Sequence, residues 1–168
     1  MKLENIDKTR YRKHLNKVIL ACIVGLIVLS LSISTLVIYL VNDGESSHFW
    51  INFAGVVIAS FIIGSILAKY KQHPFMYEIA YVWDLKQVLN QIHRKSKKIN
   101  LAVNENDVTA IEIMYFYYKA CIQLYTLDDN TITLSSLNIK AAELDSQIAS
   151  LNLTINTENF ERKSLSAY

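Results

Sequence analysis

The sequence predicts an all-α membrane protein, with a two-helix transmembrane hairpin followed by a cytoplasmic three-helix bundle. The chain has 168 residues, of which 52% are hydrophobic and only 19% are charged, an unusual ratio for a soluble protein. Two long runs, residues 18–41 and 49–68, contain no charged side chain. The last 100 residues, 69–168, contain no Gly, which disfavours tight β-hairpins and favours helices.

Both charge-free runs are long enough to cross a bilayer. The 24 residues of 18–41 would form a helix of about 36 Å, against a hydrocarbon layer of about 30 Å, and the 20 residues of 49–68 also suffice. A cleavable signal peptide would have a shorter apolar region, of about 7 to 15 residues. A buried hairpin inside a soluble protein would need more chain to cover it. We therefore expect both runs to span.

The distribution of basic residues predicts the orientation. The N-terminal segment 1–17 is rich in Lys and Arg, and Lys69 and Lys71 follow the second run, whereas the connecting loop 42–48 contains Asp43 and Glu45 and no Lys or Arg. Because positive charge accumulates on the cytoplasmic side, both termini should be cytoplasmic and the loop periplasmic.

Small residues suggest how the two spans pack together. Gly25 and Gly64 lie at similar depth when counted from the loop, so we expect them to face each other, although the same residues could instead serve a homo-oligomer. The residues predicted to pack the spans are Ala21, Gly25, Ser32, Ser60, Gly64 and Ala68.

The segment 69–151 is predicted to form the helical bundle. Apolar residues at 3,4 spacing from Val82 to Val103 favour a helix over 75–103, after a break at His73-Pro74. A second helix is expected over 108–127 with Asn106 or Asp107 as its cap, and a third over 136–151 with Ser135 as its cap. The tail 152–168 loses the periodicity, and we expect it to fray.

The middle helix of this bundle is apolar around most of its circumference, which is typical of a helix with partners on several sides. Its tyrosines combine large area with a polar tip, as in protein interfaces. The predicted partner interface comprises Tyr115, Tyr118, Ile122 and Tyr125 on this helix and Leu137, Leu144 and Ile148 on the next.

Two basic clusters are candidates for binding anionic lipid or an acidic partner. The first also sets the topology, and the second could equally be a solvated helix face. The two clusters are Lys8, Arg10, Arg12, Lys13 and Lys17, and Arg94, Lys95, Lys97 and Lys98. We expect no nucleic-acid partner, because the net charge is only +2 and no nucleic-acid-binding motif accompanies the clusters.

No pattern of residues points to catalysis, a metal or a cofactor. The four His are scattered, and neither Cys lies at metal-ligand spacing. Asp128 and Asp129 are typical of a turn rather than of an acid–base pair. We therefore expect a protein that is not an enzyme.

Three segments resemble a small family of uncharacterised gammaproteobacterial membrane proteins. They are IDKTRYRKHLNKVI at 6–19, HPFMYEIAYVWDLKQVLNQI at 73–92 and LDDNTIT at 127–133. The resemblance covers nearly the entire chain and implies a bacterial inner-membrane location with two spans. It implies no activity and no catalytic residue.

These observations favour a non-enzymatic inner-membrane accessory subunit or scaffold, which binds a protein partner or itself through its cytoplasmic helices. The alternative is a pore-forming homo-oligomer whose water path is lined by Ser30, Ser34 and Asn52.

Overall fold

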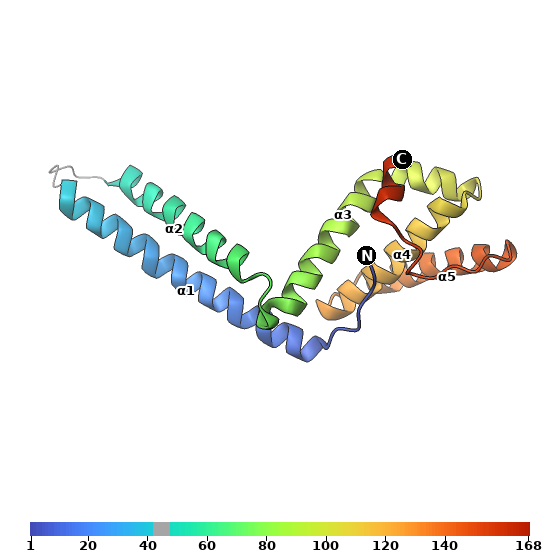
Figure 1. Ribbon diagram of the computed structural model, residues 1–168, viewed down its shortest axis with the longest axis horizontal. Coiled ribbons are helices and arrows are strands. Elements are labelled where there is room, and N and C mark those ends of the chain that lie inside the picture. Colours follow the sequence, from blue (N-terminus) through green and yellow to red (C-terminus); the bar gives the residue numbers. More distant parts are fainter. Residues whose placement is uncertain (42–47) are drawn as a thin grey trace. The chain divides into compact units, whose positions relative to one another are not determined.

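The computed structural model describes residues 1–41 and 48–168. Within these residues all regular secondary structure is helical, which confirms the all-α prediction (Figure 1). The predicted loop 42–48 lies outside the described residues except for His48. The elements are α1 (Lys8–Val41), α2 (Phe49–Tyr70), η1 (Pro74–Met76), α3 (Tyr77–Asn104), α4 (Val108–Leu127), α5 (Leu134–Ser150) and η2 (Arg162–Ala167).

The chain divides into two compact units. Residues 9–80 form the apolar unit, which contains nearly all of α1, all of α2 and η1, and the first turn of α3. Residues 1–8 and 81–168 form the core unit, which contains the rest of α3 together with α4, α5 and η2.

Helices α1 and α2 correspond to the two charge-free runs, and each is long and apolar enough to cross a membrane by length and composition. Helix α2 begins at Phe49, as predicted. Helix α1 begins at Lys8, ten residues before the charge-free run, so the basic segment is itself largely helical. A charge-free run marks where charge ends rather than where a helix begins, and Lys and Arg are good helix formers.

The break between α2 and α3 follows the predicted His73-Pro74 signal. Nδ1 of His73 accepts a hydrogen bond of 3.1 Å from the backbone N–H of Phe75. Pro74 occupies the first turn of η1, where its missing N–H costs nothing. The chain then continues directly into α3 at Tyr77.

Helices α3, α4 and α5 all end in the same way, with an Asn or Asp in the left-handed region. Asn106, Asp129 and Asn152 have φ of 61°, 56° and 52°. In each case the next residue donates its N–H back to a carbonyl in the last turn, such as Asp107 N to Ala102 O at 3.0 Å. This is the Schellman arrangement, usually built on Gly. Because residues 69–168 contain no Gly, Asn and Asp take its place.

The predicted start of α4 is confirmed, and that of α5 is wrong. The Asp107 carboxylate accepts a hydrogen bond of 2.9 Å from Ala110 N, as expected of a cap. Helix α5 begins at Leu134, so Ser135 lies within its first turn, and the capping position is Thr133, whose side chain makes no capping hydrogen bond. The turn after α4 leads directly into α5 through a bond from Leu134 N to Thr131 O.

The core unit buries the seam predicted for α3. Leu85, Ile92 and Ile99 of that seam are fully buried, as is Val88 beside it, and α4 buries a further nine residues. Helix α5 runs back along α4 and buries Leu137, Ala141, Leu144 and Ile148.

The C-terminal tail is ordered, so the expected fraying is wrong. The Phe160 ring stacks on Phe116 of α4 with 4.2 Å between ring centroids. Leu165 is buried, and the Nζ of Lys95 donates a hydrogen bond of 2.6 Å to its carbonyl. The loss of helical periodicity was misleading here, because two isolated apolar side chains are enough to anchor a tail that is not a regular α-helix.

Candidate functional site

The seven residues of the predicted partner interface fall into two groups. Leu137, Leu144 and Ile148 are buried, because α5 packs these side chains against α4 within the chain. They are therefore engaged in an internal contact. The four residues on α4 are half-buried and remain at the surface of the core unit: Tyr115, Tyr118, Ile122 and Tyr125.

A groove of about 440 Å³ lies between α3 and α4 and includes Tyr125. At one end the Nζ of Lys86 forms a 2.9 Å ion pair with Asp128. Toward the other, Nδ1 of His93 lies 3.3 Å from the hydroxyl of Tyr117. The remaining lining residues are Leu89, Asn90, Cys121 and Leu124.

The sequence alone does not reveal this groove. Lys86, Asn90 and His93 recur at i, i+4 and i+7 on α3, so they share one helical stripe beside the buried seam. That polar stripe was the feature of the sequence that could have indicated a groove. It could not show that α4 would place Tyr117 and Tyr125 opposite it.

Burial keeps the hydroxyl and thiol groups of the groove protonated. It raises the pKa of the Tyr117 hydroxyl well above its usual value, and it raises the pKa of the Cys121 thiol to about 11. The pKa values of Tyr118 and Tyr125 are also raised, mainly by burial. At neutral pH these groups are uncharged, so they suit hydrogen bonding and apolar contact better than nucleophilic chemistry.

Several residues of the basic clusters have partners within the chain. Lys8 pairs with Asp129 at the turn after α4, and Arg10 Nε lies 2.6 Å from a carboxylate oxygen of Glu78. Lys95 holds the tail through Leu165. Lys13 and Lys17, in the first cluster, and Arg94, Lys97 and Lys98, in the second, have exposed side chains.

The N-terminal segment is tied to the core unit through its backbone. Glu4 N–H donates a hydrogen bond of 2.9 Å to the hydroxyl of Tyr81, and the side-chain amide of Gln123 donates to the Glu4 carbonyl. Lys2 and Glu158 form an ion pair of 2.6 Å. This segment therefore connects α3, α4 and the tail.

Glu78 is a buried carboxylate for which the sequence predicted no role. It is 4% exposed, and besides Arg10 it faces Nδ1 of His14 at 3.3 Å. The His14 ring stacks on Phe75 with 4.1 Å between centroids. In the sequence, Glu78 is a lone acidic residue among apolar neighbours at the start of a helix, and this pattern could have indicated a buried carboxylate. A buried carboxylate needs such partners because an isolated one is costly.

Gly55 of α2 lies tightly against α1, whereas the predicted contact between Gly25 and Gly64 is not formed in this structure. A Cβ at Gly55 would overlap the Ser34 hydroxyl and lie 3.1 Å from the Ser30 carbonyl oxygen, whereas a Cβ at Gly64 would meet nothing within 4 Å. Counting residues from the loop gave the depth of each Gly but not the rotation of its helix. Of the other predicted packing residues, Ser32, Ser60 and Ala68 have exposed side chains.

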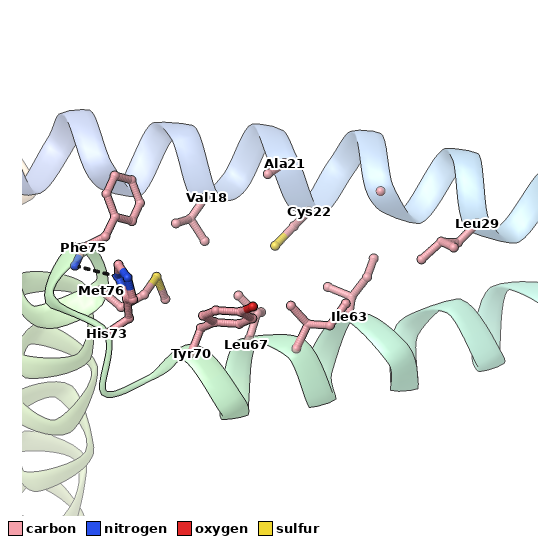
Figure 2. A pocket seen from close by; sticks show the side chains of 12 residues that line it. Val18, Ala21, Cys22, Leu29, Ile63, Leu67, Tyr70, His73, Phe75 and Met76 are labelled. Atoms are coloured by element: carbon pink, nitrogen blue, oxygen red, sulfur yellow. Dashed lines mark hydrogen bonds between the residues drawn. The ribbon is translucent and has the colours of Figure 1, made fainter.

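An apolar cavity of about 420 Å³ lies between α1 and α2, beside η1 (Figure 2). The predicted packing residues Ala21 and Gly25 line its α1 side, where Cys22 also faces inward. Tyr70 and His73 lie at the end nearest η1. These walls offer almost no polar group, so they suit apolar contact better than contact with water.

The three polar residues proposed to line a pore have different surroundings in the structure. The Ser30 hydroxyl donates a hydrogen bond of 3.1 Å to the Ile27 carbonyl of its own helix. Ser34 is buried against Gly55, and Asn52 is exposed.

In residues 1–41 and 48–168, no group of three or more His, Cys, Asp and Glu side chains could hold a metal ion.

Comparison with known proteins places the chain in a family. A family model described as "Protein of unknown function (DUF3087)" matches residues 1–165. The chain belongs to the DUF3087 family. Searches of curated proteins and of solved structures found no significant match.

Membership of the DUF3087 family agrees with the expected resemblance to a family without an assigned function. The match extends over both the apolar unit and the core unit, so the two units belong to one family architecture. The description of the family names no activity.

Proposed function

We propose that this protein is a non-enzymatic accessory subunit or scaffold of the bacterial inner membrane. In this proposal α1 and α2 form a transmembrane hairpin with both termini in the cytoplasm. Helices α3, α4 and α5 form a cytoplasmic three-helix bundle, which binds a protein partner or a second copy of the chain.

The exposure of α1 and α2 supports the membrane placement. In the most apolar part of each helix only 11% of the residues are buried. Large side chains such as Leu20, Leu40 and Phe61 are 63–75% exposed. In water such continuous apolar surfaces would be strongly unfavourable, whereas lipid tails would cover them.

The observation that most directly supports partner binding is the half-buried tyrosine face of α4. The chain covers Ala110, Met114, Cys121 and Leu124 completely or nearly so. Tyr115, Tyr118 and Tyr125 are left partly covered. Aromatic side chains with an apolar ring and an uncharged hydroxyl are enriched at binding surfaces, where a partner buries the ring and bonds the hydroxyl.

Crosslinking in native membranes tests the proposal. Membranes containing the full chain are treated with a short crosslinker, solubilised in mild detergent and analysed by mass spectrometry. We expect reproducible crosslinks from the core unit to one partner or to a second copy. They should fall about tenfold or more in a variant with Tyr115→Ala, Tyr118→Ala and Tyr125→Ala, as expected when interface anchors are truncated.

Ile139→Ala is the matched control, because Ile139 is 62% exposed on α5, away from the tyrosine face. Its crosslinks should equal those of the wild type, and circular dichroism should show the same helix content for all variants. A chain that is monomeric and free of reproducible partners would contradict the proposal. A reporter fused after Tyr168 that is active only in the periplasm would contradict the orientation.

A further inference from the structure

The cavity between α1 and α2 has the dimensions of a site for one hydrocarbon chain. Its volume of about 420 Å³ falls in the range of about 300–1,000 Å³ typical of small-molecule sites. It extends along α1 from Val18 to Leu29, which corresponds to about 16 Å of helix. That is close to half of a hydrocarbon layer of about 30 Å, the depth of a single leaflet.

The chemistry of the walls selects an apolar occupant. Val18, Cys22 and Leu29 face the cavity from α1, and Ile63 and Leu67 face it from α2 (Figure 2). Most of these side chains can offer only dispersion contacts, so they suit methylene groups better than a polar ligand.

Basic residues lie next to one end of the cavity in the sequence. Val18 and Tyr70 lie at the same end, next to η1 (Figure 2). Lys17 precedes Val18 directly, and Lys69 and Lys71 flank Tyr70. Three lysines are therefore placed one residue from the side chains at this end. Such clusters attract anionic headgroups at the cytoplasmic surface of a membrane.

We propose that this cavity binds one acyl chain of an anionic phospholipid from the cytoplasmic leaflet, with the headgroup phosphate at Lys17, Lys69 and Lys71. The inference rests on the membrane placement proposed above. A lipid fits the position better than a helix from a second copy, because the walls are apolar and three lysines neighbour the residues at one end.

Photocrosslinking to defined lipids tests this site with the full-length chain. The protein is reconstituted in phosphatidylcholine vesicles containing a small amount of phosphatidylglycerol or phosphatidylcholine with a photoreactive acyl chain. Mass spectrometry then locates the adducts. We expect adducts concentrated on the cavity-lining residues of α1 and α2, and more adduct from phosphatidylglycerol than from phosphatidylcholine. Each lysine changed to Gln should reduce that preference by up to about fivefold.

Two matched glycine variants separate the cavity from the opposite surface. A Cβ at Gly25 would lie at an ordinary contact distance, 3.6 Å, from Ile63 Cδ1, so Gly25→Leu places its added atoms in the cavity. We expect it to lower the adduct yield about tenfold by occupying the space. Gly64→Leu is the same substitution where nothing lies within 4 Å, and it should leave the yield unchanged.

The outcomes distinguish failure of this site from failure of the membrane placement. Alkaline carbonate extraction is applied first, and release of the chain would overturn the placement and the lipid site together. If the chain stays in the membrane, adducts spread evenly around α1 and α2 would overturn the lipid site alone. So would equal loss in Gly25→Leu and Gly64→Leu, equal yields from the two lipids, or protein–protein crosslinks from the cavity walls to a second copy.

Discussion

Helices α1 and α2 together bury only Tyr11, Ser34, Gly55 and Ala59, whereas α4 alone buries nine residues. Both regions are rich in the same aliphatic and aromatic side chains. In the core unit the chain covers them itself, so their burial contributes to folding in water. In the apolar unit the chain leaves most of them exposed. Equal hydrophobicity therefore has different consequences for stability, depending on what covers the side chain.

The largest expected effect distinguishes two phenylalanines. Phe116 is fully buried on α4, and Phe116→Ala should lower the free energy of unfolding of the core unit by about 3–5 kcal/mol through the cavity it creates. Phe61→Ala, on the 75% exposed Phe61 of α2, should leave that free energy unchanged. Denaturant unfolding in mild detergent, followed by circular dichroism, measures both. Equal losses of unfolding free energy in the two variants would contradict the difference in burial between the two units.

The second effect concerns the thiol of the core unit and its pH dependence. Burial raises the pKa of Cys121 from 9.0 to about 11, so at pH 8 the folded chain should contain about 100-fold less thiolate there than the unfolded chain. Maleimide labelling of a Cys22→Ala variant should be slower by at least that factor, because the thiolate is the reacting species.

The same shift gives the sign of the pH effect on stability. Between pH 9 and 11 the unfolded chain loses the Cys121 proton while the folded chain keeps it, so this group lowers stability as pH rises through that window. The labelling rate of the folded chain should continue to rise up to about pH 11. A plateau near pH 9 would contradict the burial of Cys121.

A third effect tests where α1 and α2 touch. Gly55→Leu should destabilise their association by about 1–3 kcal/mol, because the side chain would overlap Ser34 and approach the Ser30 carbonyl. Titration with a denaturing detergent, followed by circular dichroism, provides the measurement. Gly64→Leu is the control and should behave as the wild type. A larger loss in Gly64→Leu than in Gly55→Leu would instead support the contact between Gly25 and Gly64 that the sequence predicted.

The smallest effect compares two helix starts in the core unit. Asp107→Ala removes the cap of α4 and should cost about 1 kcal/mol of unfolding free energy, whereas Thr133→Ala at the start of α5 should cost nothing measurable, since Thr133 makes no capping bond. Asp107 also accepts a 3.1 Å bond from the Tyr168 hydroxyl. Tyr168→Phe isolates that contribution, and chemical denaturation compares the three variants.

The sequence predicted the features that depend on neighbours along the chain. The bounds of α4, the start of α2, the break at Pro74 and the buried seam of α3 all follow from charge, periodicity and turn chemistry within a few residues. The tyrosine face of α4 was also visible as an excess of apolar positions. The start of α1 was missed because the predicted boundary depended on charge alone.

The sequence by itself determined which segments are helical and how they end, because a helix is built from hydrogen bonds and side-chain contacts three and four residues apart. Only the tertiary structure decided that Gly55 meets Ser34, that Phe160 stacks on Phe116 and that Lys86 and His93 share a groove with α4. Those contacts join residues 21 to 44 positions apart. They depend on how each helix is rotated about its axis, and many side chains determine that rotation together.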